Sequence, residues 1–326
     1  MKKKHLIFIF PVLFFSCGST QNGKTEQNLQ PVIVVEAPIF NADSAYLYIQ
    51  NQVDFGARVP NSAAHKACAV YLANELRRFG AEVTEQNAAL KAYDGTILNA
   101  VNIVGAFSPE KTTRILLMAH WDSRPFADND PDVDNHKKPV LGANDGASGV
   151  GVLLEIARLM NENLPKVGVD IIFFDAEDYG QPYFYKQAEV PNSWCLGSQY
   201  WARNPHQPNY HARYGILLDM VGAPGASFKK DAVSALYAPQ VLTKVWTTAQ
   251  SLDYGSLFYD EKGGYITDDH VYINELAGIP CIDIIDFDEN GFFEHWHTVK
   301  DDMSNISKNT LKAVGQTILE VIYNEK

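Results

Sequence analysis

Short apolar runs that alternate with helical segments constrain the fold of this chain most strongly. Residues 114–119 and 169–174 form runs that are too short for ordinary helices and lack the in–out alternation of a half-exposed strand. Such runs are typical of strands buried on both faces. Between them, residues 149–160 carry one apolar helical stripe, made of Val152, Leu153, Ile156 and Leu159. This alternation predicts an α/β fold whose central, mostly parallel mixed sheet is flanked by helices on both faces.

The remaining elements are predicted from the same pattern. Helical periodicity covers residues 42–79, where Gly80 provides a stop. Further strands are expected at residues 101–105, 215–218 and 279–285, and further helices at 195–203, 240–252 and around Leu311, Val314, Ile318, Val321 and Ile322. The 326 residues contain no Pro/Ser-rich linker and no internal repeat after about residue 40. We therefore expect a single catalytic domain over residues 41–326.

The charge of the chain excludes one class of partner. Its formal net charge is −12, and no basic stripe interrupts the acidic composition, so nucleic acid is not an expected partner. Cys68, Cys195 and Cys281 are widely spaced and form no CxxC motif, so no zinc finger or redox motif is predicted. We expect these cysteines to be packed as small apolar side chains, although one disulfide stays possible.

The first residues have the features of an export signal. Lys2, Lys3 and Lys4 precede an apolar run at residues 6–15 that is too short to span a bilayer. Ser16-Cys17 follows, and this ending resembles the lipobox of bacterial lipoproteins, although Phe14 departs from the usual aliphatic residue. Loss of a signal peptide at residues 1–16 removes three lysines and changes the net charge from −12 to −15. An ordinary cleaved signal with an incidental cysteine is the alternative.

The lipobox resemblance implies a location as well as a modification. Cys17 would carry lipid and become the new N-terminus, and residues 17–40 would form a flexible tether. The chain would then be exported and anchored to the bacterial membrane in the cell envelope, on the periplasmic side or at the outer membrane.

Polar side chains follow the predicted strands repeatedly, at the points where strand gives way to loop. They are His120 and Asp122, then Asp175, Glu177 and Asp178, then Asp219, and finally Asp283 and Asp286. In open α/β sheets, active sites form at the carboxyl ends of the strands. Each residue alone has an ordinary explanation, such as a helix cap or a buried histidine. Together they favour a metal site, because catalytic zinc takes nitrogen and carboxylate ligands and leaves one position open.

From about residue 42 onward, the motifs resemble the co-catalytic zinc aminopeptidase superfamily. The specific marker is the Gly-Ala-Asn-Asp-Gly-Ala-Ser-Gly segment at residues 142–149, which precedes a predicted helix. Within that superfamily, the chain is more similar to the glutaminyl-peptide cyclotransferases. That closer similarity rests on the segments at residues 173–178, 218–224, 268–270 and 296–302.

The resemblance implies a function and a ligand set. The family cyclises the N-terminal glutamine of peptides or proteins to pyroglutamate and releases ammonia. One Zn²⁺ per chain would be bound by Asp145, Asp178 and His297. Asp178 departs from the animal cyclases, which carry Glu at this position. Either carboxylate can bind zinc, but the shorter side chain requires a different loop path.

The resemblance also implies roles for residues beside the metal. Glu177 would act as the proton-shuttling base and acid, Asp219 and Asp268 would form a hydrogen-bonded acidic pair, and Trp296 would form a wall of the substrate pocket. His120 and Asp122 are candidates for a second metal or for support of the first. Because His120 and Asp219 also match the extra ligands of two-zinc aminopeptidases, removal of N-terminal residues stays an alternative. A non-catalytic peptide-binding protein on a peptidase fold is the third possibility.

Overall fold

The computed structural model describes residues 36–326. The predicted signal peptide 1–16 and Cys17 lie outside the described residues. The end of the predicted tether needs a correction, because the folded domain begins before residue 41. Phe40 is buried, its amide donates to Gln316 Oε1 at 2.9 Å, and its carbonyl accepts from Lys312 Nζ at 2.8 Å. Segment 38–40 is therefore part of the domain.

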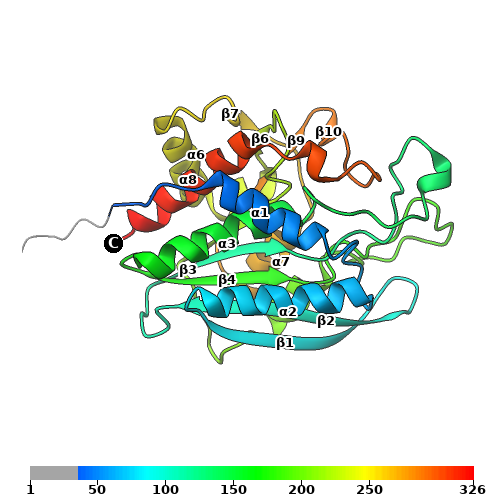
Figure 1. Ribbon diagram of the computed structural model, residues 1–326, viewed down its shortest axis with the longest axis horizontal. Helices are drawn as coiled ribbons and strands as arrows, with labels where there is room; N and C mark the ends of the chain where they lie inside the picture. Colours follow the sequence, from blue (N-terminus) through cyan, green and yellow to red (C-terminus); the bar gives the residue numbers. More distant parts are fainter. Residues whose placement is uncertain (1–35) are drawn as a thin grey trace, which may run out of the picture. The chain divides into compact units, whose positions relative to one another are not determined.

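A six-stranded sheet forms the centre of the domain, in the order β1-β2-β4-β3-β5-β8. Figure 1 labels four of these strands, β1, β2, β4 and β3. The strands are β1 (Glu82–Lys91), β2 (Ile97–Phe107), β3 (Arg114–His120), β4 (Gly168–Phe174), β5 (Tyr214–Asp219) and β8 (Cys281–Ile285). The pairs β4·β3, β3·β5 and β5·β8 are parallel, whereas β2 runs antiparallel to both of its neighbours. The predicted mostly parallel mixed sheet is confirmed.

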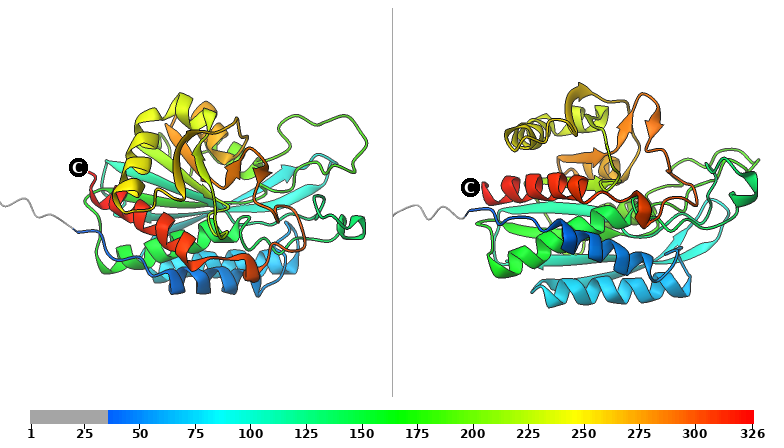
Figure 2. Two further views of the ribbon diagram at one scale, coloured as in Figure 1. Left: turned by 90° about the horizontal axis from the view of Figure 1, so that it is seen from above. Right: turned by 45° about the horizontal axis from the view of Figure 1, so that its top comes forward.

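Helices cover both faces of this sheet (Figure 2). One face is covered by α1 (Ala42–Val53), α2 (Ala63–Arg78), α3 (Ala147–Glu162) and α8 (Lys308–Tyr323). The opposite face is covered by α4 (Leu196–Arg203), α7 (Asp269–Tyr272) and the π-helical turn η2 (Ile273–Ala277). Toward the β8 edge lie α5 (Ala232–Tyr237) and α6 (Pro239–Ser251). The shorter elements are β6 (Phe228–Lys230), β7 (Phe258–Lys262), β9 (Phe287–Asp288), β10 (Gly291–Phe292), η1 (Val133–Asn135) and η3 (Met303–Asn305).

The apolar run of β3 shows why the central strands read as continuous hydrophobic segments. Ile115 and Leu117 pack into the core below α1, α2, α3 and α8, whereas Leu116 and Met118 pack into the core that includes Trp201 of α4. All seven residues of β3 are buried. Because successive strand residues point to opposite faces, a strand covered on both sides must be apolar at nearly every position.

Two local predictions differ from the structure. Residues 42–79 form two helices, because Asn41 and Ser62 each cap a separate N-terminus and segment 54–62 turns the chain between them. Strand β1 was not predicted. It lies at the edge of the sheet, and its side chains are half-buried or exposed, so it lacks the apolar signal of the central strands.

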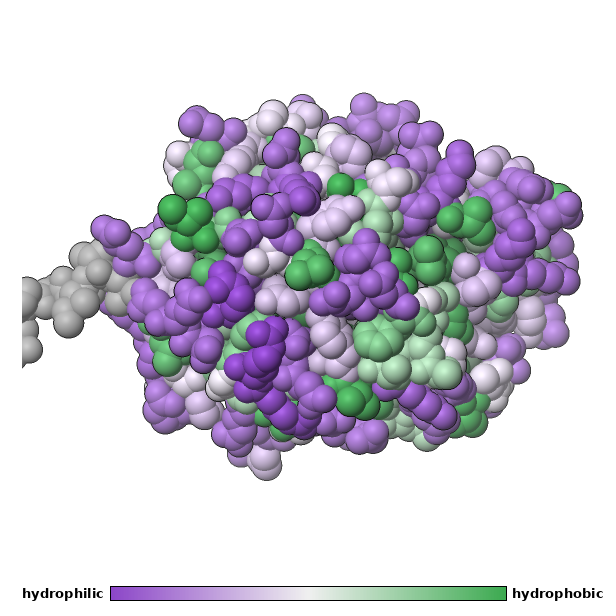
Figure 3. Space-filling view, in the orientation of Figure 1, coloured by the Kyte–Doolittle hydropathy of each residue, from purple (hydrophilic) through white to green (hydrophobic). Residues whose placement is uncertain are grey.

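The surface of the domain agrees with its acidic composition. The face seen in Figure 1 is mostly hydrophilic, with small apolar patches between polar side chains (Figure 3). Within residues 36–326, no helix is both long enough and apolar enough to cross a membrane.

Candidate active site and metal centre

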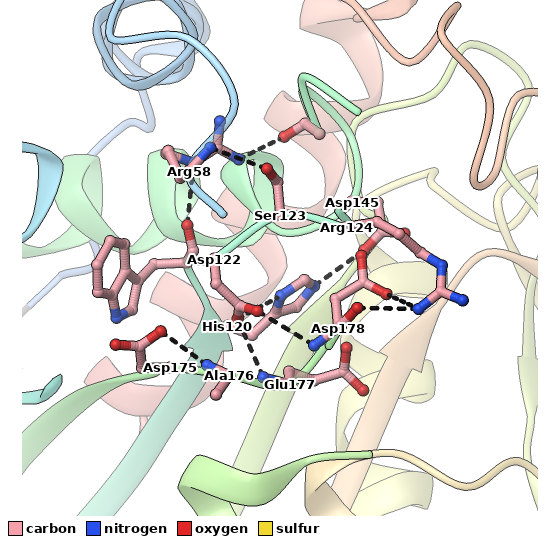
Figure 4. A network of polar contacts seen from close by, with 12 residues as sticks. Arg58, His120, Asp122, Ser123, Arg124, Asp145, Asp175, Ala176, Glu177 and Asp178 are labelled. Atoms are coloured by element: carbon pink, nitrogen blue, oxygen red, sulfur yellow. Dashed lines mark hydrogen bonds and ion pairs between the residues drawn. The ribbon is translucent and has the colours of Figure 1, made fainter. Parts of the chain in front are cut away.

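The carboxyl ends of three neighbouring strands place polar side chains around one point. His120 is the last residue of β3, Asp219 is the last residue of β5, and Glu177 and Asp178 lie in the loop after β4. Asp145 comes from the segment just before α3. Figure 4 shows His120, Asp145 and Asp178 gathered together, with Glu177 beside them. The strand ends thus place these residues close together.

Two overlapping groups of side chains have the composition of metal sites. In the first, His297 Nε2 lies 3.1 Å from Asp178 Oδ1 and 3.6 Å from Asp145 Oδ2. In the second, His120 Nε2 lies 3.0 Å from Asp145 Oδ1 and 3.2 Å from Asp219 Oδ1. Within each group the potential ligand atoms lie within 4.8 Å of one another. Asp145 belongs to both groups.

Asp178 indicates that the first group is suited to a cation. Both of its carboxylate oxygens are buried, and neither accepts a hydrogen bond of good geometry from the described residues, although Oδ1 lies 3.1 Å from His297 Nε2 and 3.5 Å from Arg124 Nη1. A buried carboxylate that accepts no hydrogen bond is costly, and a metal ion would satisfy it. Imidazole nitrogen and carboxylate oxygen are the ligands that zinc takes in catalytic sites. The residues present therefore fit the metal that the sequence predicts.

A buried ion pair supports this group from behind. Arg124 donates to Asp128 through Nε at 2.8 Å and Nη2 at 2.7 Å, and its Nη1 donates to the Asp178 carbonyl at 2.9 Å. Asp128 Oδ1 lies 3.5 Å from Nδ1 of His297, so the other ring nitrogen faces the two acids. Burial raises the pKa of Asp128, but hydrogen bonds from Arg124 and His297 outweigh it and lower the pKa overall. Asp128 thus stays ionised and orients His297.

Two further carboxylates hold the backbone of the site. Asp122 accepts hydrogen bonds from the amides of Glu177 at 3.1 Å and Asp178 at 3.2 Å. Asp301 accepts from the amides of Asn144 at 2.7 Å and Asp145 at 3.1 Å. Asp122, a candidate for a second metal or for support, lies outside both donor groups and holds the loop that carries Glu177 and Asp178.

The backbone turns sharply where it presents these residues. Ala176, Met220 and His297 have left-handed backbone angles, with φ of 54°, 49° and 54°, and Cys195 has φ of 56°. This conformation is unfavourable for residues other than glycine, and it tends to occur at functional sites. These turns lie next to Glu177, next to Asp219 and at His297, where the chain presents the side chains of the site.

Three acids near the metal donors share a low-dielectric setting. Removal from solvent raises the pKa of Glu177, and the charges of Asp178 and Asp268 add to this against the opposing charge of His120. Burial likewise raises the pKa of Asp219 to about 7, although a hydrogen bond with His120 opposes it. Asp268 accepts from the Asp269 amide at 2.5 Å, and its Oδ2 is buried and accepts no hydrogen bond from the part of the chain that the structure describes. The hydrogen bond predicted between Asp219 and Asp268 stays a prediction.

A cavity of about 330 Å³ opens beside these acids. Its acidic side is formed by Asp145, Glu177, Asp178, Asp219 and Asp268, and its apolar side includes Trp194, Ile266, Ile285, Phe287, Phe292 and Trp296. The ring of Trp296 stacks on His297 with centroids 3.8 Å apart. Trp296 therefore lies where the sequence predicts a wall of the pocket.

Several polar residues expected at strand ends lie elsewhere. Asp175 faces away from the cavity and contacts His65 Nε2 at 2.9 Å, and Asp283 is inside β8 rather than after it. Asp286 accepts from the Ser227 amide at 2.8 Å. None of these three lines the cavity, because a strand-end position does not determine which side of the loop a residue faces.

Sequence reasoning missed five residues that shape the site, namely Arg124, Asp128, Trp194, Cys195 and Asp301. They lie in loops or at a helix start without hydrophobic periodicity, so only three-dimensional contact identifies them. The Asp-Asp pair at 301–302, inside a motif already singled out, was the only available signal. Cys68, Cys195 and Cys281 are buried, as expected of packed small side chains, and none of them pairs with another described cysteine.

Comparisons with known proteins agree with this geometry. A Bacteroides thetaiotaomicron glutaminyl cyclase solved with N-acetylhistamine is 60% identical, covering 89% of this chain and 100% of its own, with a TM-score of 0.88. A structure from B. thetaiotaomicron VPI-5482 named a leucine aminopeptidase precursor is 61% identical, covering 90% and 100%, with a TM-score of 0.88. The bovine (Bos taurus) glutaminyl-peptide cyclotransferase is 25% identical over 301 residues, covering 82% of this chain and 78% of its own.

The match extends through the fold as well as the site. The model of peptidase family M28 matches residues 102–322, which include every member of both donor groups. The chain therefore belongs to peptidase family M28.

Proposed function

We propose that this chain is a zinc-dependent glutaminyl-peptide cyclotransferase. It converts the N-terminal glutamine of peptides or proteins to pyroglutamate and releases ammonia. The observation that carries the proposal is the division of roles between two adjacent acids. Asp178 is itself a potential metal ligand, in the group with Asp145 and His297. Glu177 also lines the cavity but belongs to neither of the two groups around Asp145. The 60% identity to a solved glutaminyl cyclase supports this assignment.

Asp145, Asp178 and His297 would hold one zinc ion. When bound, zinc supplies Lewis-acid polarisation of the glutamine γ-carbonyl. His297 would contribute Nε2, because Asp128 lies at its Nδ1. Asp178 would contribute a buried carboxylate whose oxygens accept no hydrogen bond from the described residues.

Glu177 would move the proton in both halves of the reaction. The substrate's α-amine nitrogen attacks the γ-carboxamide carbon, and Glu177 accepts the proton that this nitrogen loses. The same proton returns to the amide nitrogen as its bond to carbon breaks, and ammonia leaves. An unperturbed α-amine has a pKa of about 8, so a base with a raised pKa is well matched to it.

The remaining residues would bind the substrate and exclude water. Trp194 and Trp296 line the cavity, and their rings would enclose the glutamine side chain. Asp219 and Asp268 lie on the acidic side, where they would accept hydrogen bonds from the substrate amine. Cyclisation needs no external nucleophile, so a cavity of about 330 Å³ with apolar walls suits it.

Aminopeptidase activity is the second candidate, and one observation favours it. His120 and Asp219 complete a second donor group around Asp145, which is the arrangement needed for two metals. A relative of 61% identity also carries an aminopeptidase name. The number of zinc ions per chain separates the two candidates: one favours the cyclase and two favour the peptidase.

The test combines metal analysis with two activities of the purified chain. We expect about one zinc per chain, ammonia release from a Gln-initiated dipeptide, and no free N-terminal amino acid. Glu177→Gln keeps the size of the side chain but cannot accept a proton, so kcat should fall on the order of 10²–10⁴-fold with zinc retained. Glu110→Gln, at an exposed turn, is the matched control. Cyclisation within a few-fold of wild type in Glu177→Gln would refute the mechanism.

We also propose that the enzyme works outside the cytoplasm, anchored through lipid on Cys17. The basic and apolar residues before Ser16-Cys17 support this. Its substrates would then be peptides or proteins of the cell envelope or its surroundings.

A further inference from the structure

Cys195 contacts the proposed general base at two points. Its Sγ donates to Glu177 Oε1 at 3.1 Å, and its backbone amide donates to the Glu177 carbonyl at 2.9 Å. The next amide, that of Leu196, donates to the carbonyl of Ala176 at 3.0 Å. The start of α4 is therefore bound directly to the loop that carries Glu177.

The thiol at this position is a hydrogen-bond donor. Cys195 is completely buried, so it is closed to solvent, and it forms no disulfide with another cysteine of residues 36–326. Burial raises the pKa of Cys195 well above its ordinary value, and the charge of Glu177 raises it further. The sulfur thus keeps its proton, and the carboxylate is the acceptor.

We propose that Cys195 is a positioning residue that holds Glu177 Oε1 through its S–H and so presents Oε2 to the substrate amine. The inference rests on the proposed cyclase function. Among the described residues, no other side chain donates to the Glu177 carboxylate. One oxygen is therefore occupied by the protein, and the other is left for the proton that leaves the substrate nitrogen.

The surrounding backbone fixes the position of the Cys195 thiol relative to Glu177. Cys195 adopts a left-handed φ of 56° immediately before α4, which turns both its amide and its side chain toward Glu177. Gly197, two residues later, lies so close to the β4 end that a Cβ there would collide with the Asp175 carbonyl. The first turn of α4 is thus packed tightly against segment 175–177, so the donor has little freedom to move away.

The contact between Cys195 and Glu177 should affect the rate of cyclisation, because Glu177 transfers the proton. The substrate proton must go to Oε2 and return from Oε2 to the departing ammonia nitrogen, and Cys195 keeps its own proton throughout. Loss of the S–H would let the carboxylate rotate, so that Oε2 faces the amine for a smaller fraction of the time. Small misplacements of catalytic groups can cost up to about 100-fold in rate.

The test uses two replacements in the full chain and measures ammonia release from a Gln-initiated dipeptide. Cys195→Ala should lower kcat by about tenfold to about 100-fold, with KM changed less than twofold and zinc content unchanged. Cys195→Ser keeps an O–H donor and should recover most of that loss. Cys281→Ala is the matched control: that cysteine is also completely buried and free, but its thiol contacts a carbonyl within β8. It should cyclise like wild type.

A double variant decides whether the thiol acts through Glu177. In the Glu177→Gln background, Cys195→Ala should cause no further fall in kcat, since the group it positions no longer transfers a proton. Equal falls in both backgrounds would overturn the proposal and indicate a general packing role. So would Cys195→Ala with wild-type kcat, or Cys195→Ser as slow as Cys195→Ala. Failure of the proposed function itself is distinguishable, because wild-type chain with zinc would then release no ammonia.

Discussion

Asp128→Asn tests whether the ion pair behind His297 sets the affinity of the metal site. Asp128 faces Nδ1 of His297 at 3.5 Å and accepts two hydrogen bonds from Arg124. Asparagine has nearly the same volume and retains one acceptor oxygen, but buried Arg124 loses its charged partner, so the free energy of unfolding should fall and zinc affinity is compared on folded protein. It loses the negative charge that fixes the ring orientation and makes the ligand nitrogen more basic.

The expected change in zinc affinity follows from the contact between Asp128 and a proposed zinc ligand, His297. Replacing a carboxylate that supports a ligating histidine typically weakens metal binding by about 10-fold to 100-fold. This corresponds to about 1.4–2.7 kcal/mol of binding free energy at 25 °C. Asp178 and Asp145 are unchanged, so the site should weaken without being abolished. A complete loss of zinc would require His297 or Asp178 itself to move.

Competition with a chelator of known affinity measures the effect directly. The zinc dissociation constant should rise by the stated factor, while activity at saturating zinc should stay within a few-fold of wild type. Asp134→Asn, an exposed residue in the same loop region, is the control and should leave zinc affinity unchanged. Wild-type zinc affinity in a folded Asp128→Asn protein would show that Asp128 does not support His297.

Three further outcomes are expected. Arg114→Met should lower the free energy of unfolding by about 3–5 kcal/mol, measured by urea denaturation, because Asp170, 1% exposed, loses its bidentate partner. A loss below about 1 kcal/mol would contradict this. Trp296→Ala should raise KM for Gln-peptides more than it lowers kcat, since the ring lines the cavity; steady-state kinetics with unchanged KM would argue against a substrate-wall role. Cys17→Ser should release the protein from the membrane fraction or leave its signal uncleaved, and wild-type maturation and fractionation would end the lipoprotein hypothesis.

The central strands and their ends could be predicted because strands buried on both faces require short, continuous apolar runs in the sequence. β3, β4 and α3 lie within a few residues of their predicted bounds, and His120 and Asp219 terminate strands as expected. The edge strand β1 escaped prediction because its side chains are not required to be apolar.

Contacts between loops could not be predicted in the same way. Asp128 has no periodic neighbours, and Cys195 was predicted only as the first residue of a helix. The roles of both residues arise from tertiary contacts with His297 and Glu177. Asp283 was grouped with the strand-end residues, although it lies inside both the predicted strand 279–285 and β8, where Asp268 and His270 lie beside it in a buried group. The type of a residue and the strand to which it belongs do not determine which side chains it contacts in the folded domain.

The left-handed residues around the site bear on how this protein could become more heat-resistant. Ala176, Cys195, Met220 and His297 each adopt a conformation that costs roughly 1–2 kcal/mol for a residue with a side chain. Their combined cost is comparable to a large part of the ~5–15 kcal/mol that keeps a domain folded. Ala176→Gly would remove one such cost but would also loosen the segment that holds Glu177. Substitutions that raise thermal tolerance in this loop should therefore lower turnover. The strands of the sheet, which carry no such residues, are in this respect a different target for engineering.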